Sequence, residues 1–81
     1  PYPNPFNPTM KMDLIIPYDR RMDIRVYDLL GNEIDVISNK EIYKQGIYTL
    51  TWSGDNHPSG IYFIKFEDRT DLRVRKIILT K

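Results

Sequence analysis

Apolar and polar residues alternate with a period of two along most of this chain, as they do in β-strands that bury one face. The first alternating segment is 10–16, and it ends at Pro17, which has no N–H group to donate to a strand ladder. The second is 22–27. The positions that share the apolar faces of these two segments are Met10, Met12, Leu14, Ile16, Met22, Ile24 and Val26. Both segments are therefore predicted to be strands.

A tight turn at Gly31-Asn32 follows, because this dipeptide favours the positive φ that such turns need. Residues 33–37 then resume an extended pattern with Ile34 and Val36 on one side. The sequence therefore predicts a hairpin. The more polar segment 38–45 is expected to be a short edge strand or a loop that crosses between sheets.

The strongest strand pattern is 47–52, where Tyr48, Leu50 and Trp52 share one face and β-branched residues fill the other. We expect Trp52 to be mostly buried between two sheets. A dense cluster of turn-forming residues, 53–60, separates this strand from a further one at 61–67. The arrangement predicts a second hairpin.

The last alternating segment is 72–80, after a charged turn at 68–71. Ile78 shares a face with Val74, and this face is expected to contribute to the core. No window shows the periodicity of a helix. Short strands separated by turns predict an all-β, two-sheet antiparallel sandwich of about six or seven strands.

The chain is expected to contain one domain, residues 9–81, after a lead-in or linker, residues 1–8, in which four of the eight residues are proline. We expect it to be a piece of a longer polypeptide. A domain of this size buries only roughly 60% of its unfolded surface, so its stability margin is predicted to be small.

Composition excludes several classes of function. With no cysteine, the chain has no disulfides, thiolate metal sites or cysteine nucleophiles. A net charge of +1 is far from the dense positive field that nucleic-acid binding requires. No apolar stretch is long enough to predict membrane insertion.

Individual polar residues suggest no reaction. His57 lies between Asn56 and Pro58, where a solvated surface position is the simplest interpretation. Oxygen atoms of Ser53, Asp55 and Asn56 could bind a hard cation, but capping of the turn explains the same residues. We therefore expect no catalytic residues, no metal and no cofactor.

Two further sets of polar residues are open to a structural and a functional interpretation. Asp68 and Asp71, flanked by Arg69 and Arg73, are more simply a charge-balanced turn than a general acid and base. Three tyrosines fall in loops or opposite the apolar faces and could form an exposed aromatic surface: Tyr18, Tyr27 and Tyr43.

The glycines at strand ends are expected to have positive φ: Gly31, Gly46, Gly54 and Gly60.

Five segments in order, 2–8, 27–34, 46–52, 59–65 and 76–81, carry a resemblance to a known family. Together they resemble the type A C-terminal sorting domain of the type IX secretion system. That domain is similar in sequence to the immunoglobulin-like domain of flagellar hook-capping proteins. The resemblance implies an immunoglobulin-like sandwich.

The same resemblance implies a non-enzymatic sorting module of a secreted or cell-surface protein that is exported through the periplasm of a Gram-negative bacterium. Its implied partners are the outer-membrane secretion machinery and the N-terminal domains of its own parent protein. Two alternatives stay open at this point. One is an immunoglobulin-like spacer or assembly domain, and the other is a carbohydrate-binding module that would use Tyr18 and Tyr43.

On the same basis, the last strand and two turns are the expected recognition elements. The last strand should lie at or near a sheet edge, with its terminal lysine accessible to a partner. The residues expected to take part are Gly31, Gly60, Arg73, Arg75, Lys76 and Lys81.

Overall fold

The computed structural model describes residues 9–81, so the expectation for residues 1–8 lies outside the described part of the chain. This part contains strands and no helix, and nothing in it could cross a bilayer as an apolar helix. The strands are β1 (Thr9–Ile16), β2 (Arg20–Asp28), β3 (Glu33–Tyr43), β4 (Gly46–Ser53), β5 (Gly60–Glu67) and β6 (Leu72–Leu79).

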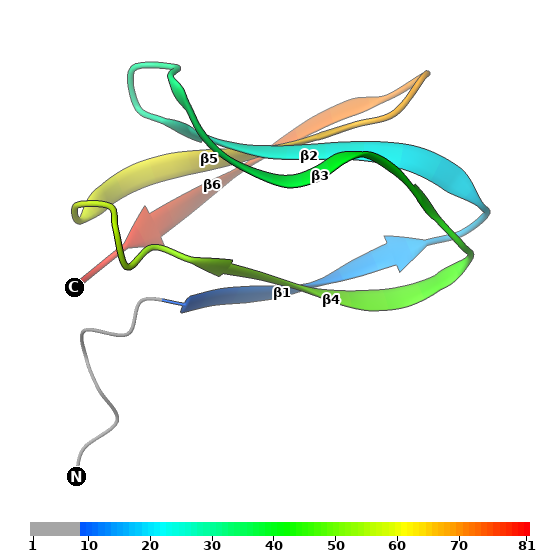
Figure 1. Cartoon of the computed structure of the whole chain (residues 1–81), viewed down its shortest axis with the longest axis horizontal. Helices are drawn as coiled ribbons and strands as arrows, with labels where there is room; N and C mark the ends of the chain where they lie inside the picture. Colours follow the sequence, from blue (N-terminus) through cyan, green and yellow to red (C-terminus); the bar gives the residue numbers. More distant parts are fainter. Residues whose placement is uncertain (1–8) are drawn as a thin grey trace, which may run out of the picture.

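The strands form two antiparallel sheets that face each other (Figure 1). One sheet has two strands in the order β1-β4, and the other has four in the order β3-β2-β5-β6. In an immunoglobulin-like sandwich, strands B and E are neighbours in one sheet, and strands C′, C, F and G follow one another in the other. The observed order matches this topology and confirms the predicted all-β sandwich. Within residues 9–81 no strand takes the place of strand A or strand D.

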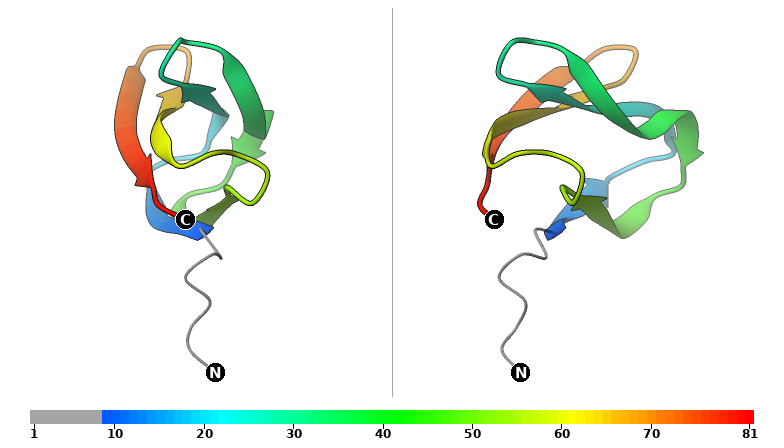
Figure 2. Two further views of the ribbon diagram at one scale, coloured as in Figure 1. Left: turned by 90° about the vertical axis from the view of Figure 1, so that its left-hand side faces the viewer. Right: turned by 60° about the vertical axis from the view of Figure 1, so that its left-hand side comes forward.

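The core lies between the two sheets and is formed by the inward faces that the period-two pattern predicted, except in β6. Its most buried members come from five of the strands, and these are Ile16, Met22, Ile24, Val26, Leu50, Trp52, Tyr62, Ile64 and Leu79. Figure 2 views the sandwich from its end and shows β6 curving from the larger sheet toward the side of β1. The smaller sheet therefore covers only part of the larger one.

β3 is longer than predicted, because segment 38–45 continues the strand as far as Tyr43 before the chain crosses to β4. Its pairing with β2 contains three register shifts. These bulges carry Val36 to an exposed position, whereas Ile34 packs against the core. The prediction that Ile34 and Val36 lie on one side of this strand was therefore wrong. The polar Ser38 is buried instead, and its Oγ donates to the carbonyl of Met22 at 2.9 Å.

The predicted hairpin between 47–52 and 61–67 was wrong. β4 pairs with β1, and β5 pairs with β2 and β6, so the turn-rich segment 54–59 crosses between the sheets. The end of this segment next to β5 is held by Tyr62, whose hydroxyl donates to the carbonyl of Pro58. A tyrosine near the start of strand F that bonds back to the preceding corner is a recurrent feature of immunoglobulin-like domains.

The two faces of β6 are the reverse of the prediction. Leu79 is buried at 6% exposure and packs in the core, while Ile78 is 70% exposed on the outer surface. The register with β5 explains the difference, because Leu79 lies opposite Gly60 and Ile78 lies opposite the outward-facing Ile61. The apolar residues on both faces of this strand made the inward face ambiguous in sequence.

The expectation of positive φ holds for three of the four glycines and is wrong for Gly54. Gly31 has φ 88° in the turn between β2 and β3. Gly54 is required for a different reason, because a Cβ added there would lie 2.6 Å from both terminal methyl groups of Leu79. The crossing segment can approach the end of β6 only because this position has no side chain.

Candidate recognition surface

The six residues expected to take part in recognition do not form a single cluster. Gly60 and Lys81 lie together at the end of the sandwich where β5 begins and β6 ends (Figure 1). The turn that contains Gly31 lies at the same end, since Asp28 pairs with Tyr62 near the start of β5. The remaining three, Arg73, Arg75 and Lys76, follow β6 away from this end.

Lys81 is accessible but is held by two hydrogen bonds. Its backbone N–H donates to Ser59 Oγ at 3.1 Å, and its Nζ donates to the carbonyl of Asp55 at 2.8 Å. Both acceptors belong to the segment that crosses between the sheets. The exposed end of β6 is therefore attached to this crossing segment and does not project freely.

The turn at Gly31 is stabilised by one carboxylate. Asp28 accepts hydrogen bonds from the backbone N–H groups of Leu30 and Asn32 and from the side-chain amide of Asn32. These donors favour the charged form, and the Asn32 backbone N–H is the largest cause that lowers the pKa of Asp28. The geometry gives Gly31 a structural position in the turn.

β6 is an edge strand of the four-stranded sheet, as expected for a recognition strand. Its basic residues are divided between its two faces. Arg73 and Arg75 lie opposite Phe66 and Ile64 on the inner face, and Lys76 lies on the outer face. All three are exposed: Lys76 faces away from the smaller sheet, and Arg73 and Arg75 lie where that sheet does not extend beneath β6.

A cleft of about 730 Å³ lies between β6 and β1 on this uncovered side. Its lining includes residues 12–15 of β1 and residues 73–75 of β6. Met22 of β2 and Phe66 of β5 also line it, from the inner face of the larger sheet. The cleft therefore has apolar surface from both sheets and guanidinium groups at the side of β6.

The cleft also contains an ion pair that the sequence analysis missed. Arg20 Nη1 donates to Asp68 Oδ2 at 2.8 Å, and both residues line the cleft. Asp68 was expected to be balanced by Arg69, a neighbour in sequence, but its observed partner is distant in sequence. Local patterns carry no signal for such a contact, which requires the pairing of β2 with β5.

Asp68 also accepts hydrogen bonds from the backbone N–H groups of Thr70 and Asp71. The Thr70 N–H is the largest cause that lowers the pKa of Asp68, and Arg20 adds an attraction in the same direction. Asp71 pairs with Arg73 at 3.0 Å, so the charged turn is balanced as predicted, except that Arg20 replaces Arg69.

The outer face beside Lys76 is partly apolar. Ile78 and Val74 flank this lysine on β6, and both are exposed. Across the strand pair, Ile61 lies opposite Ile78 and Phe63 lies opposite Lys76. Lys76 therefore presents its charge from an apolar surface, whereas Arg73 and Arg75 present theirs to the cleft.

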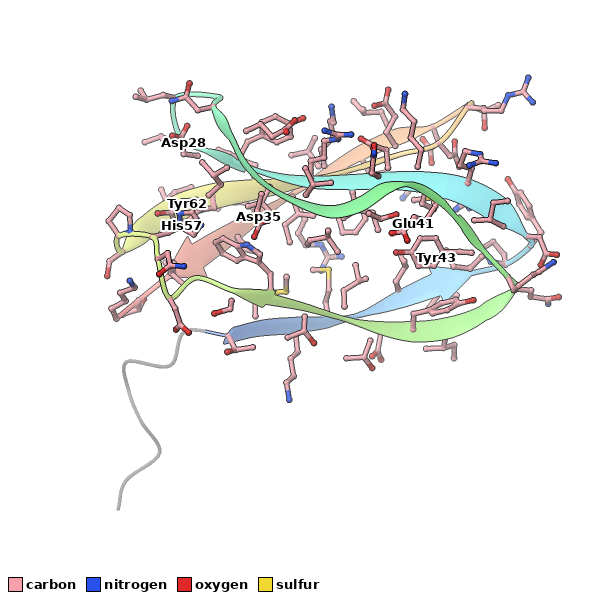
Figure 3. The ribbon with its side chains drawn as sticks, in the orientation of Figure 1. Asp28, Asp35, Glu41, Tyr43, His57 and Tyr62 are labelled. Carbon is pink, nitrogen blue, oxygen red and sulfur yellow. The ribbon has the colours of Figure 1, made fainter. Side chains whose placement is uncertain are left out.

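His57 does not have the solvated position predicted for it. Its ring stacks on Trp52, with centroids 5.6 Å apart and planes inclined by 22°, and lies close to Tyr62 (Figure 3). The segment that crosses between the sheets thus covers the edge of the core with this side chain. His57 has a packing role here.

The aromatic platform considered above is not assembled, and the cation site at Ser53, Asp55 and Asn56 stays a hypothesis. Across residues 9–81, no three acidic or histidine side chains are grouped so that they could hold a metal ion. Of the three candidate tyrosines, Tyr18 is exposed, whereas Tyr43 packs edge-on against Tyr48 and Tyr27 lies beneath Lys65. These rings therefore do not share one exposed face.

Comparison with known proteins identifies the family of this chain. No curated protein and no solved structure matches the chain. A family model described as the secretion system C-terminal sorting domain matches residues 1–80. It is the family that the sequence resembles, and its members are sorting signals of proteins that are secreted or displayed on the cell surface. The chain therefore belongs to the family of type IX secretion system C-terminal sorting domains.

Proposed function

We propose that this domain is recognised by the outer-membrane secretion machinery through β6 and the basic residues that it carries. An edge strand offers unpaired backbone groups to a partner strand. Arg73, Arg75 and Lys76 surround this edge with positive charge, which steers an acidic partner and discourages pairing with other edges. The observation that carries the proposal is the edge position of β6 with three exposed basic side chains.

The domain serves as a recognition signal for export and performs no reaction. Residues 9–81 form the recognised unit, residues 1–8 connect it to the N-terminal domains of its parent protein, and the parent crosses the periplasm of a Gram-negative bacterium before it reaches the outer membrane. The side chains considered for catalysis form turns or packing contacts, which supports a passive domain. Native mass spectrometry should find no stoichiometric transition metal, and a bound metal would contradict this proposal.

Export of a fused reporter tests the recognition proposal. The variant replaces Arg73, Arg75, Lys76 and Lys81 with Gln, and in a type IX-competent host the exported fraction should fall markedly. Circular dichroism and urea unfolding of the purified variant check that the sandwich is intact. If the folded variant is exported as efficiently as the original domain, recognition through these charges is wrong.

A further inference from the structure

The smaller sheet is one strand shorter than its counterpart in an immunoglobulin-like sandwich, where strand B lies between strands A and E. Within the described chain, β1 takes the place of strand B and its only partner strand is β4. Figure 2 shows β1 and β6 on the same side of the sandwich, and residues 12–15 of β1 line the cleft between them. A strand in the place of strand A would therefore extend the smaller sheet over this cleft.

The lining of the cleft indicates the chemistry of an occupant. Four strands contribute apolar residues to it, and these are Met12, Leu14, Met22, Phe66 and Val74. Its charged residues are balanced, three aspartates against three arginines: Asp13, Asp68, Asp71, Arg20, Arg73 and Arg75. Two of the arginines are already paired with two of the aspartates. An uncharged occupant with apolar side chains therefore complements this lining better than a charged one.

The segment that precedes β1 in this chain has these properties. Residues 1–8, which lie outside the described part, carry no charged side chain, and every one of them is proline, asparagine or an aromatic residue. They are joined directly to β1, so their effective concentration at the cleft is high. The family model also matches from residue 1, so the sequence pattern that members of the family share includes this segment.

The prolines of this segment have the spacing that suits an edge strand. Successive residues of a strand direct their N–H groups to opposite edges. Pro1, Pro3 and Pro5 occupy alternate positions, so the edge on which N–H groups are missing is the same for all three. Tyr2 and Asn4 keep their N–H groups on the other edge. Both residues precede a proline, which favours an extended backbone.

The segment is also long enough to reach the cleft. Asn-Pro dipeptides are typical of turns, so the chain would reverse across residues 6–9, with Asn7-Pro8 at the centre. Residues 1–5 would then lie opposite residues 10–14 of β1, and each stretch spans about 14 Å at about 3.4 Å per residue. In this register the prolines are opposite Met10, Met12 and Leu14, the inward-facing residues of β1 that pack against the core.

We propose that residues 1–5 form a further strand of this domain, antiparallel to β1 on the side away from β4, and that their uncharged side chains cover the cleft. Tyr2 and Asn4 donate backbone hydrogen bonds to β1, and the prolines pack on its inward face. The residues that connect the domain to its parent thus also complete its smaller sheet. This inference goes beyond the proposed recognition by β6 and is independent of it, because the added strand pairs with β1.

NMR of the full chain tests the pairing directly. The amide hydrogens of Tyr2 and Asn4 should exchange with solvent at least about tenfold more slowly than in a free synthetic peptide of residues 1–8, because each is held in a hydrogen bond. Nuclear Overhauser contacts should join residues 1–5 to residues 10–14. Exchange at the rate of the free peptide, or the absence of these contacts, would overturn the proposal.

Two matched substitutions test the role of the proline spacing. Asn4→Pro removes a donor from the edge that faces β1, so the amide of Tyr2 should lose its protection and exchange within about twofold of the peptide rate. Pro3→Ala adds an N–H group on the opposite edge and should leave this protection within about threefold of the original. The amide of Ile24, in the core of β2, should be unaffected by either change and shows that the sandwich stays folded. Equal effects of the two substitutions on Tyr2 would contradict the proposed register.

A mixture of isotope-labelled and unlabelled chains distinguishes the chain's own segment from that of a second copy. Contacts between residues 1–5 and β1 should arise within one molecule and should not change with protein concentration. Contacts between labelled and unlabelled chains would mean that a second copy supplies the strand, and the proposal would be wrong. Export of a reporter does not enter these measurements, so their outcome is separate from that of the proposed recognition by β6.

Discussion

At the residue scale, Trp52 connects the two sheets by more than its apolar surface. It is 3% exposed, its Nε1 donates to Asp35 Oδ2 of β3 at 2.8 Å, and its ring contacts those of His57 and Tyr62 (Figure 3). One side chain on β4 thus contacts β3, β5 and the segment between the sheets.

Replacing Trp52 with Ala should destabilise the domain by about 3–5 kcal/mol, because the change removes a large buried ring and leaves a cavity. This loss is of the order of the whole stability of a small domain. Trp52→Phe is the matched control and should be milder, since it keeps most of the apolar contact. Urea unfolding measures both variants, and an emission maximum typical of water-exposed indole in the original protein would contradict the premise.

Gly54 provides a second test at this scale. A Cβ at this position would clash with Leu79, which is itself buried, so Gly54→Ala should cost about 1–3 kcal/mol through overpacking. The clash depends on one neighbour. In a Leu79→Ala background the same substitution should therefore cost much less, and a double-mutant cycle in urea measures the difference. Additive effects would show that the strain arises elsewhere.

At the scale of the elements, the strands were predictable and their arrangement was only partly so. Alternation is a local signal, and the apolar faces of segments such as 22–27 and 47–52 are the observed inward faces. Whether 54–59 turns back into a hairpin or crosses between sheets depends on which distant strand each neighbour pairs with. Turn-forming residues favour both outcomes equally, so the sequence could not distinguish them.

The inward face of β6 was misassigned for a related reason. Both faces carry apolar residues near the end of the strand, and both carry basic residues nearer its start. Arginines on an inward face contradict the usual pattern of a sandwich core. They can be accommodated here because the smaller sheet leaves that face uncovered. The extent of the smaller sheet cannot be predicted from the residues of β6.

A matched pair of substitutions tests this assignment. Leu79→Ala should destabilise the domain by about 2–5 kcal/mol, whereas the neighbouring Ile78→Ala should change its stability by no more than about 0.5 kcal/mol. Urea denaturation of the two variants gives the comparison. Equal losses would mean that Ile78 contributes to the core after all.

The candidate site was predictable in its position along the chain but not in its composition. The resemblance pointed to β6, and the structure places this strand at an edge with exposed basic residues. Arg20 and the residues of β1 that line the cleft were not anticipated. They become neighbours of β6 only when the two sheets pack against each other.

At the scale of the whole molecule, four carboxylates make stability depend on pH. Hydrogen bonds lower the pKa values of four aspartates below their ordinary value of 3.8. The largest causes are the Gln45 backbone N–H for Asp19, the Arg25 side chain for Asp23, the Asn32 backbone N–H for Asp28 and the Thr70 backbone N–H for Asp68. Because each group holds its proton more weakly when folded, its stabilisation is present above the unfolded pKa and is lost as the pH falls through the folded pKa.

We therefore expect the free energy of unfolding to decrease steadily below about pH 4, the region of the unfolded aspartate pKa. Asp68→Asn should be less stable than the original domain at neutral pH. The difference should narrow toward pH 2, where Asp68 is protonated and resembles the amide. Thermal unfolding measured across this range gives the comparison, and a difference that stays constant with pH would contradict the assigned cause.

The pairing of β1 with β4 also has a consequence for the order in which the molecule folds. The register joins Thr9 to Ser53 and Ile16 to Gly46, so a long stretch of chain must be enclosed before this sheet forms. By contrast, β2 with β3 and β5 with β6 are local hairpins. The entropy of loop closure therefore makes β1 the last strand to dock. Leu14→Ala should accelerate unfolding and leave the refolding rate nearly unchanged in stopped-flow measurements, whereas a substitution in β5 should slow refolding.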